Sequence, residues 1–126
     1  MTAVEGDARA VADARRNLHD VPGLTLVHGP VERVLEERAR PGAEDGPVAA
    51  DVVVLDPPRT GARARVVAAV AALRPRAVAY VACDPAALAR DVATFADHGY
   101  VLRGLRAFDL FPQTHHLESV ALLGPR

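Results

Sequence analysis

The sequence contains a single cysteine, no tryptophan, three phenylalanines and two tyrosines among its 126 residues. One cysteine excludes an internal disulfide and is typical of the reducing cytoplasm. With so few aromatic side chains, the core must consist mainly of small aliphatic residues, as it does in helix-covered parallel sheets. No apolar run approaches the roughly 20 residues that cross a membrane, and no signal-peptide pattern is visible at the N-terminus. We therefore expect a cytoplasmic domain of ordinary size.

The chain also lacks an excess of positive charge, because its formal net charge is −1. A free-standing protein that binds nucleic acid through bulk electrostatics needs such an excess. The charge does not exclude a catalytic module whose contacts with RNA lie on another domain.

Apolar periodicity and turn residues predict strands that alternate with helices along most of the chain. The predicted strands are 2–5, 24–28, 51–55, 77–82, 100–108 and 117–123, the predicted helices are 8–19, 31–39, 62–73 and 85–97, and 40–50 is a surface loop. The last two strands follow each other directly. We expect a doubly wound α/β sheet that ends in an antiparallel strand pair.

Cys83 lies where the predicted strand 77–82 gives way to the helix 85–97. Pro85 suits the first helical turn, and Asp84 has the side chain of an N-cap. A thiol at this position feels the positive end of the helix dipole, which favours the reactive thiolate. A lone cysteine is more often a small buried hydrophobe, so its role depends on its neighbours.

Three carboxylates lie at the ends of other predicted strands. Glu5 ends the first strand, Asp56 follows the strand 51–55, and Glu118 lies near the start of the last one. Ligands of open α/β sheets collect outside the carboxyl ends of the strands, so Asp56, Cys83 and Glu118 can face one crevice. Asp56 is equally well suited to cap a turn. Glu5 suits ribose hydroxyls but is also an ordinary solvated charge.

Three segments of the chain, 56–61, 80–85 and 108–118, resemble the signatures of the RNA uracil-C5 methyltransferases. These enzymes use S-adenosylmethionine to form 5-methyluridine in transfer and ribosomal RNA. The first signature matches at Asp56, Pro57, Arg59, Gly61, Tyr80, Cys83 and Pro85, and the second at Asp109, Phe111, Pro112, Thr114, His116 and Glu118. Around the cysteine, Ala82, Asp84 and Ala87 replace the family's serine, asparagine and threonine.

The resemblance implies a Rossmann-like class I methyltransferase fold and a role for each candidate residue. Cys83 corresponds to the nucleophile that attacks carbon 6 of uracil, and Glu118 to the base that removes the carbon-5 proton. Glu5 and Asp56 correspond to positions that contact S-adenosylmethionine. The implied partner is tRNA or rRNA, whose target base must be flipped out of its stack.

The first predicted strand, which ends at Glu5, resembles the second strand of such a fold. No glycine-rich turn precedes it, and that turn normally holds the cofactor. We therefore interpret 1–126 as the C-terminal part of a catalytic domain, without the first strand, the glycine-rich loop and the RNA-binding barrel. We expect the isolated chain to be inactive. The alternative is an inactive remnant or a partner-dependent, non-catalytic module.

The sequence gives less support to two other interpretations of these residues. The amino-methyltransferases have an aromatic residue after their Asp/Asn-Pro-Pro motif, where this chain has Arg59. A zinc site built from Cys83, His115, His116 and Glu118 is disfavoured, because adjacent residues of an extended segment point to opposite faces. Arginines in 59–65 suit either RNA phosphates or water.

Overall fold

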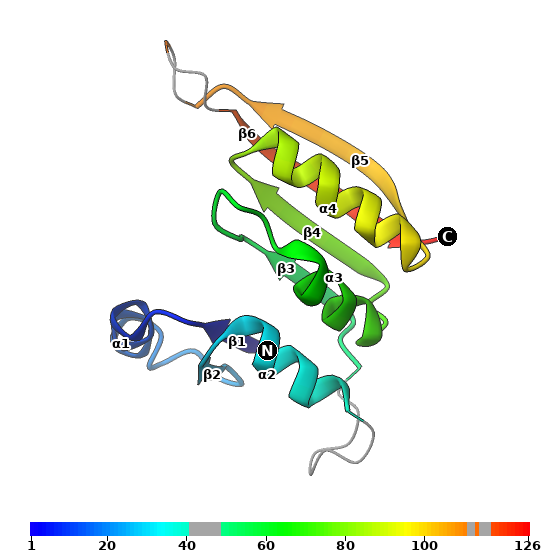
Figure 1. Ribbon diagram of the computed structural model, residues 1–126. Coiled ribbons are helices and arrows are strands. Elements are labelled where there is room, and N and C mark those ends of the chain that lie inside the picture. Colours follow the sequence, from blue (N-terminus) through cyan, green and yellow to red (C-terminus); the bar gives the residue numbers. More distant parts are fainter. Residues whose placement is uncertain (41–48, 111–112, 114–116) are drawn as a thin grey trace.

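Strands and helices alternate along the chain until the last helix, after which two strands follow in succession (Figure 1). The computed structural model describes residues 1–40, 49–110, 113 and 117–126. The strands are β1 (Thr2–Glu5), β2 (Thr25–His28), β3 (Val52–Leu55), β4 (Ala77–Ala82), β5 (Tyr100–Phe108) and β6 (Glu118–Pro125). The helices are α1 (Ala8–Asn17), α2 (Val31–Ala39), α3 (Arg63–Ala72) and α4 (Pro85–Asp97). The predicted order of elements is confirmed, with boundaries that differ by one or two residues.

Four strands form one sheet in the order β3-β4-β6-β5. β3 and β4 are parallel, whereas β6 is antiparallel to both β4 and β5. β6 therefore lies between β4 and β5 and places the end of the chain in the middle of the sheet. This arrangement confirms the predicted antiparallel pair at the end of an α/β fold.

β1 and β2 form a separate parallel pair. Among the described residues, no hydrogen bonds join this pair to β3. The link is instead α2, which contacts both α3 and β1. Figure 1 shows β1 and β2 apart from the larger sheet, on the side of β3.

Helices α3 and α4 cover one face of the four-stranded sheet (Figure 1). Alternate residues of β4 point into this layer, where Val78 and Tyr80 are fully buried against Val67, Val70 and Phe95. The opposite face carries exposed apolar side chains, which include Val52, Val54 and Leu122. The core of the larger sheet is thus built on the helix-covered side, and small aliphatic residues supply most of it, as expected.

The helices in the described parts of the chain are all too short or too polar to span a membrane.

Candidate active site

Cys83 lies in the tight connection between β4 and α4 and is half-buried. Asp84 has extended backbone geometry, and its Oδ1 accepts a hydrogen bond of 2.7 Å from the backbone nitrogen of Ala87. Pro85 then opens the helix. The predicted N-cap and helix start are both confirmed. The Asp84 side chain satisfies a backbone amide that has no partner within the first helical turn.

Glu118 is the first residue of β6 and is half-buried. β4 and β6 are antiparallel with Ala82 opposite Ser119. Cys83 and Glu118 each lie one residue beyond that pair, at the same end of neighbouring strands. The structure therefore brings the thiol and this carboxylate to one edge of the sheet, although 35 positions separate them in the sequence.

Asp56 and Glu5 follow or end two other strands, β3 and β1, and both are exposed. The chain leaves β1, β3 and β4 on the same side of the molecule (Figure 1), and Glu5, Asp56 and Cys83 end or follow these three strands. Oε1 of Glu5 accepts a hydrogen bond of 2.7 Å from the backbone nitrogen of Asp7. Exposed carboxylates at strand ends suit the hydroxyl and amino groups of a nucleoside-like cofactor.

Part of the second signature lies outside the described residues. Asp109 is exposed just after β5. The matches predicted at Phe111, Pro112, Thr114 and His116, and the histidine at 115, lie outside the described residues.

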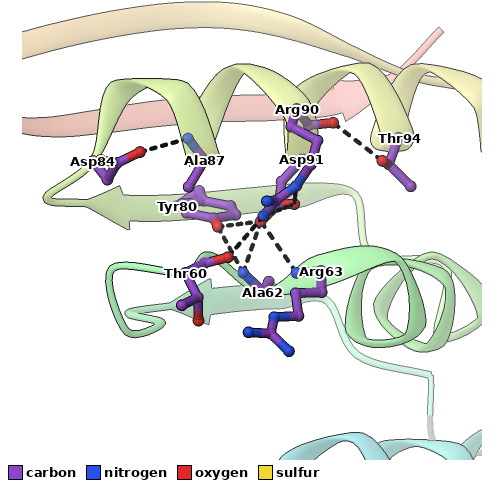
Figure 2. Close-up of polar contacts among 9 residues, drawn as sticks. All are labelled: Thr60, Ala62, Arg63, Tyr80, Asp84, Ala87, Arg90, Asp91 and Thr94. Carbon is purple, nitrogen blue, oxygen red and sulfur yellow. Dashed lines mark hydrogen bonds and ion pairs between the residues drawn. The ribbon is translucent and has the colours of Figure 1, made fainter.

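A dense group of hydrogen bonds surrounds Asp91, which is fully buried on α4, the helix that follows Cys83. Its Oδ2 accepts hydrogen bonds from the Tyr80 hydroxyl at 2.6 Å and from the backbone nitrogens of Ala62 at 2.7 Å and Arg63 at 3.2 Å. Its Oδ1 accepts from Nε and Nη2 of Arg90, at 3.1 and 3.0 Å. Figure 2 shows these donors converging on Asp91 from β4, from α4 and from the start of α3. The carboxylate therefore joins the end of the loop after β3 to β4 and α4, the two elements that flank Cys83.

Gly61 allows this close approach. Its φ is +76°, and a Cβ added there would lie 2.5 Å from Oδ2 of Asp91 and 2.6 Å from Nη2 of Arg90. Any other residue would be strained in this backbone conformation and would also collide with the carboxylate. The glycine of the first signature is thus explained by packing against α4.

Two groups of this network have shifted pKa values. Burial alone would raise the pKa of the Asp91 carboxyl, but hydrogen bonds from Tyr80, Arg90 and two backbone amides outweigh it and hold the pKa below its usual value. Burial, followed by the hydrogen bond to Asp91, raises the pKa of the Tyr80 hydroxyl far above its usual value. At neutral pH, a buried carboxylate therefore accepts from a neutral phenol.

Asp91 and its partners were not predicted as site residues, although the sequence contains a signal for them. Leu88, Asp91 and Phe95 lie at positions i, i+3 and i+7, on the buried face of α4. A charged residue on an apolar helical face requires compensating partners. Its partners could not be read from periodicity, because Ala62 and Arg63 are 28 or more positions away.

The chain is similar over most of its length to bacterial proteins described as uncharacterized RNA methyltransferases. The relative from Streptomyces avermitilis is 50% identical over 122 residues, which cover 97% of this chain and 27% of the relative. The relative from Bifidobacterium longum is 46% identical over 124 residues and is also covered to 27%. The chain thus spans about a quarter of the length of the proteins that it matches.

Solved structures show the same fold. The tRNA (uracil-54, C5)-methyltransferase of Pyrococcus abyssi, in complex with S-adenosyl-L-homocysteine, superposes with a TM-score of 0.75 at 28% identity, over 98% of this chain and 28% of that one. Fibrillarin from Aeropyrum pernix has a TM-score of 0.70 at 17% identity, over 95% of this chain and 54% of that one. The predicted Rossmann-like methyltransferase fold is confirmed.

A sequence model of one family covers the segment from β3 to β6, which includes the loop with Asp56 and the connection with Cys83. It is the tRNA (Uracil-5-)-methyltransferase family, and its match extends over residues 44–126. The chain belongs to the tRNA (uracil-5-)-methyltransferase family.

Proposed function

We propose that this chain is the C-terminal part of an enzyme that methylates carbon 5 of a uridine in tRNA or rRNA through a covalent cysteine adduct. The observation that carries the proposal is the position of Cys83 at the start of α4, with Glu118 one residue beyond the neighbouring Ala82–Ser119 pair. Membership in the family supports the reaction class. Cys83 is the chain's only thiol, so nucleophilic attack by sulfur has one candidate.

The residue types fit the electronic demand of this reaction. Carbon 5 of uracil is a weak nucleophile. When the Cys83 thiolate forms a bond to carbon 6, the electron pair of the 5,6 double bond moves toward carbon 5 and the O4 enolate. Carbon 5 then becomes nucleophilic enough to be methylated. Cys83 is half-buried, so part of the residue remains exposed where a base would enter.

Asp56 and Glu5 fit the expected cofactor, because both are exposed carboxylates at the carboxyl ends of the strands β3 and β1. We assign the ribose hydroxyls of the cofactor to Glu5 and a second polar contact to Asp56. S-adenosylmethionine, when bound, supplies the methyl group that carbon 5 receives.

Glu118 completes the cycle in this proposal. Its carboxylate takes the proton from carbon 5, the electron pair of that C–H bond restores the 5,6 double bond, and the bond between carbon 6 and sulfur breaks. The thiolate of Cys83 is thereby regenerated. The half-buried position of Glu118 at the start of β6, one residue beyond the Ala82–Ser119 pair, supports this assignment.

The second candidate is a non-catalytic module that works only with a partner. Among the described residues, β1 and β3 share no hydrogen bonds. This separation supports a role for an additional polypeptide segment that joins the two sheets. We propose that a longer enzyme supplies this part, because the chain covers only 27% of the length of its bacterial relatives.

Trapping with 5-fluorouridine tests the proposed function. Fluorine cannot leave carbon 5 as a proton does, so the complete enzyme should remain bound to RNA that carries the analogue at the target. The adduct should survive a denaturing gel and should be lost in Cys83→Ala. Cys83→Ala protein that still methylates RNA at a near-normal rate would exclude this mechanism.

A further inference from the structure

We propose that a hollow at the start of α4, bordered by Asp84, the residue after Cys83, binds a phosphate of the substrate RNA backbone, next to the nucleotide that is methylated. The hollow lies between the loop after β3, the start of α3 and the first half of α4, and has a volume of about 630 Å³. That volume lies within the range of ligand pockets, about 300–1,000 Å³. The inference rests on the proposed function, because it takes RNA as the substrate.

Three arginines from separate segments line the hollow: Arg59, Arg63 and Arg90. Guanidinium groups have a planar fork of donors that matches phosphate oxygens, and they remain charged at all relevant pH values. Among the residues that the structure describes, neither Arg59 nor Arg63 has an ion-pair partner. Both are exposed, so their charges remain available to a ligand.

Acidic groups near the hollow are already bonded within the protein. Asp84 lines the hollow, and its Oδ1 accepts from the amide of Ala87. Asp91 is fully buried and forms an ion pair with Arg90, whose Nη2 also donates to the backbone oxygen of Thr60 at 2.8 Å. Three arginines set against these two carboxylates leave a positive balance, although the whole chain has a net charge of −1.

Arg63 has a backbone conformation that is unusual for its residue type. Its φ is +67°, in the left-handed region that favours glycine or asparagine. Asp91 stabilises this conformation by accepting from the Arg63 backbone nitrogen, and Figure 2 shows the side chain extending away from Asp91. The Arg63 guanidinium is therefore directed away from the buried carboxylate, and the residue is exposed at the hollow.

The location also suits a phosphate beside the reacting base. Asp84, the immediate neighbour of Cys83, borders the hollow, as do Ala86 and Ala87 in the first turn of α4. The positive end of the helix dipole adds to the attraction for an anion there. Each nucleotide is flanked by two phosphates, so a base at Cys83 brings a phosphate into this region.

The test measures RNA binding by the complete enzyme as a function of salt. Anisotropy of a fluorescein-labelled, uridine-rich single-stranded RNA, from about 50 to 200 mM salt, gives the slope of log affinity against log salt. Arg59→Ala and Arg63→Ala should each weaken binding about three- to tenfold and reduce the slope by about 0.7, the contribution of one single-strand phosphate. Arg9→Ala, on the exposed surface of α1, is the matched control and should change neither quantity.

Arg63→Gly separates binding from folding. Glycine relieves the positive φ, so this variant should melt at the wild-type temperature or above it, yet bind RNA as weakly as Arg63→Ala. Arg59 and Arg63 variants that match the Arg9→Ala control in affinity and slope would overturn the proposal. If fluorouridine trapping were normal at the same time, only the phosphate-site proposal would be rejected and the methylation mechanism would stand. Loss of trapping in the wild type with arginine-dependent binding intact would remove only the methylation mechanism.

Discussion

The Tyr80 hydroxyl donates a hydrogen bond of 2.6 Å to the Asp91 carboxylate, and both side chains are fully buried. Tyr80 lies near the end of β4 and Asp91 lies in the middle of α4, so the bond connects the two elements that flank Cys83. The same carboxylate accepts from the amides of Ala62 and Arg63. One buried group therefore fixes the end of the loop after β3 against β4 and α4.

Asp91→Asn should destabilise the fold by about 1–3 kcal/mol, because an amide places a donor where the structure has only donors. Urea unfolding of residues 1–126 measures the loss of unfolding free energy. The readout specific to positioning is the rate at which iodoacetamide alkylates Cys83, which reports on this single thiol. Asp97→Asn, at the exposed end of α4, is the control. Unchanged stability and alkylation in Asp91→Asn would contradict the role given to the network.

Stability should fall at both ends of the pH range. The pKa of Asp91 is lowered in the fold, so its contribution is present above about pH 4, the unfolded pKa, and is lost as the pH falls through the folded value. The pKa of Tyr80 is raised, so its contribution is present below about pH 10 and is lost as the pH rises toward the folded value. Thermal melting across pH measures both limbs.

Tyr80→Phe and Asp91→Asn assign the two limbs of that pH profile. Tyr80→Phe should flatten the alkaline limb in part, because burial also raises the pKa of Tyr100 and leaves its contribution in place. Asp91→Asn should flatten the acid limb. A profile in which neither substitution changes its own limb would show that other groups control the pH dependence.

Gly61→Ala should be more damaging than Gly99→Ala, although both glycines have positive φ. A Cβ at Gly99 meets nothing within 4 Å, so strain alone should cost about 1–2 kcal/mol there. At Gly61 the Cβ would also lie 2.5 Å from Oδ2 of Asp91, and we expect about 1–3 kcal/mol more. Equal unfolding free energies for the two variants would show that the carboxylate moves aside without cost.

Glu118→Gln should separate the two halves of the proposed reaction. Without a base for the carbon-5 proton, addition and methylation proceed but release stalls, so methylated RNA should accumulate as a covalent complex on a denaturing gel. Glu37→Gln, on the exposed surface of α2, is the control and should turn over normally. Lost turnover without an adduct in Glu118→Gln would assign Glu118 to binding or structure instead.

Local patterns in the sequence were sufficient for the elements and for the junction at Cys83. Strand and helix periodicity, Asp84 as the N-cap and Pro85 at the helix start are short-range features, and the structure confirms them. The insertion of β6 between β4 and β5 depends on pairing between distant segments, which periodicity does not encode. The same limit applies to Asp91, whose donors come from three elements, and to the positive φ of Arg63.

The separate hydrogen bonding of the β1–β2 pair bears on how the chain opens and closes. Among the described residues, the pair shares no strand hydrogen bonds with the larger sheet, and α2 contacts both β1 and α3. Such a unit can open on its own, before the region around β4 and α4 does. Amide hydrogens of β1 and β2 should therefore exchange with deuterium faster than those of β4 and β6. Cys83 and Glu118 lie in the part of the chain where we expect slow exchange, whereas Glu5 lies in the part where we expect fast exchange. Binding of the cofactor to Glu5, as proposed, would therefore also order the first two strands.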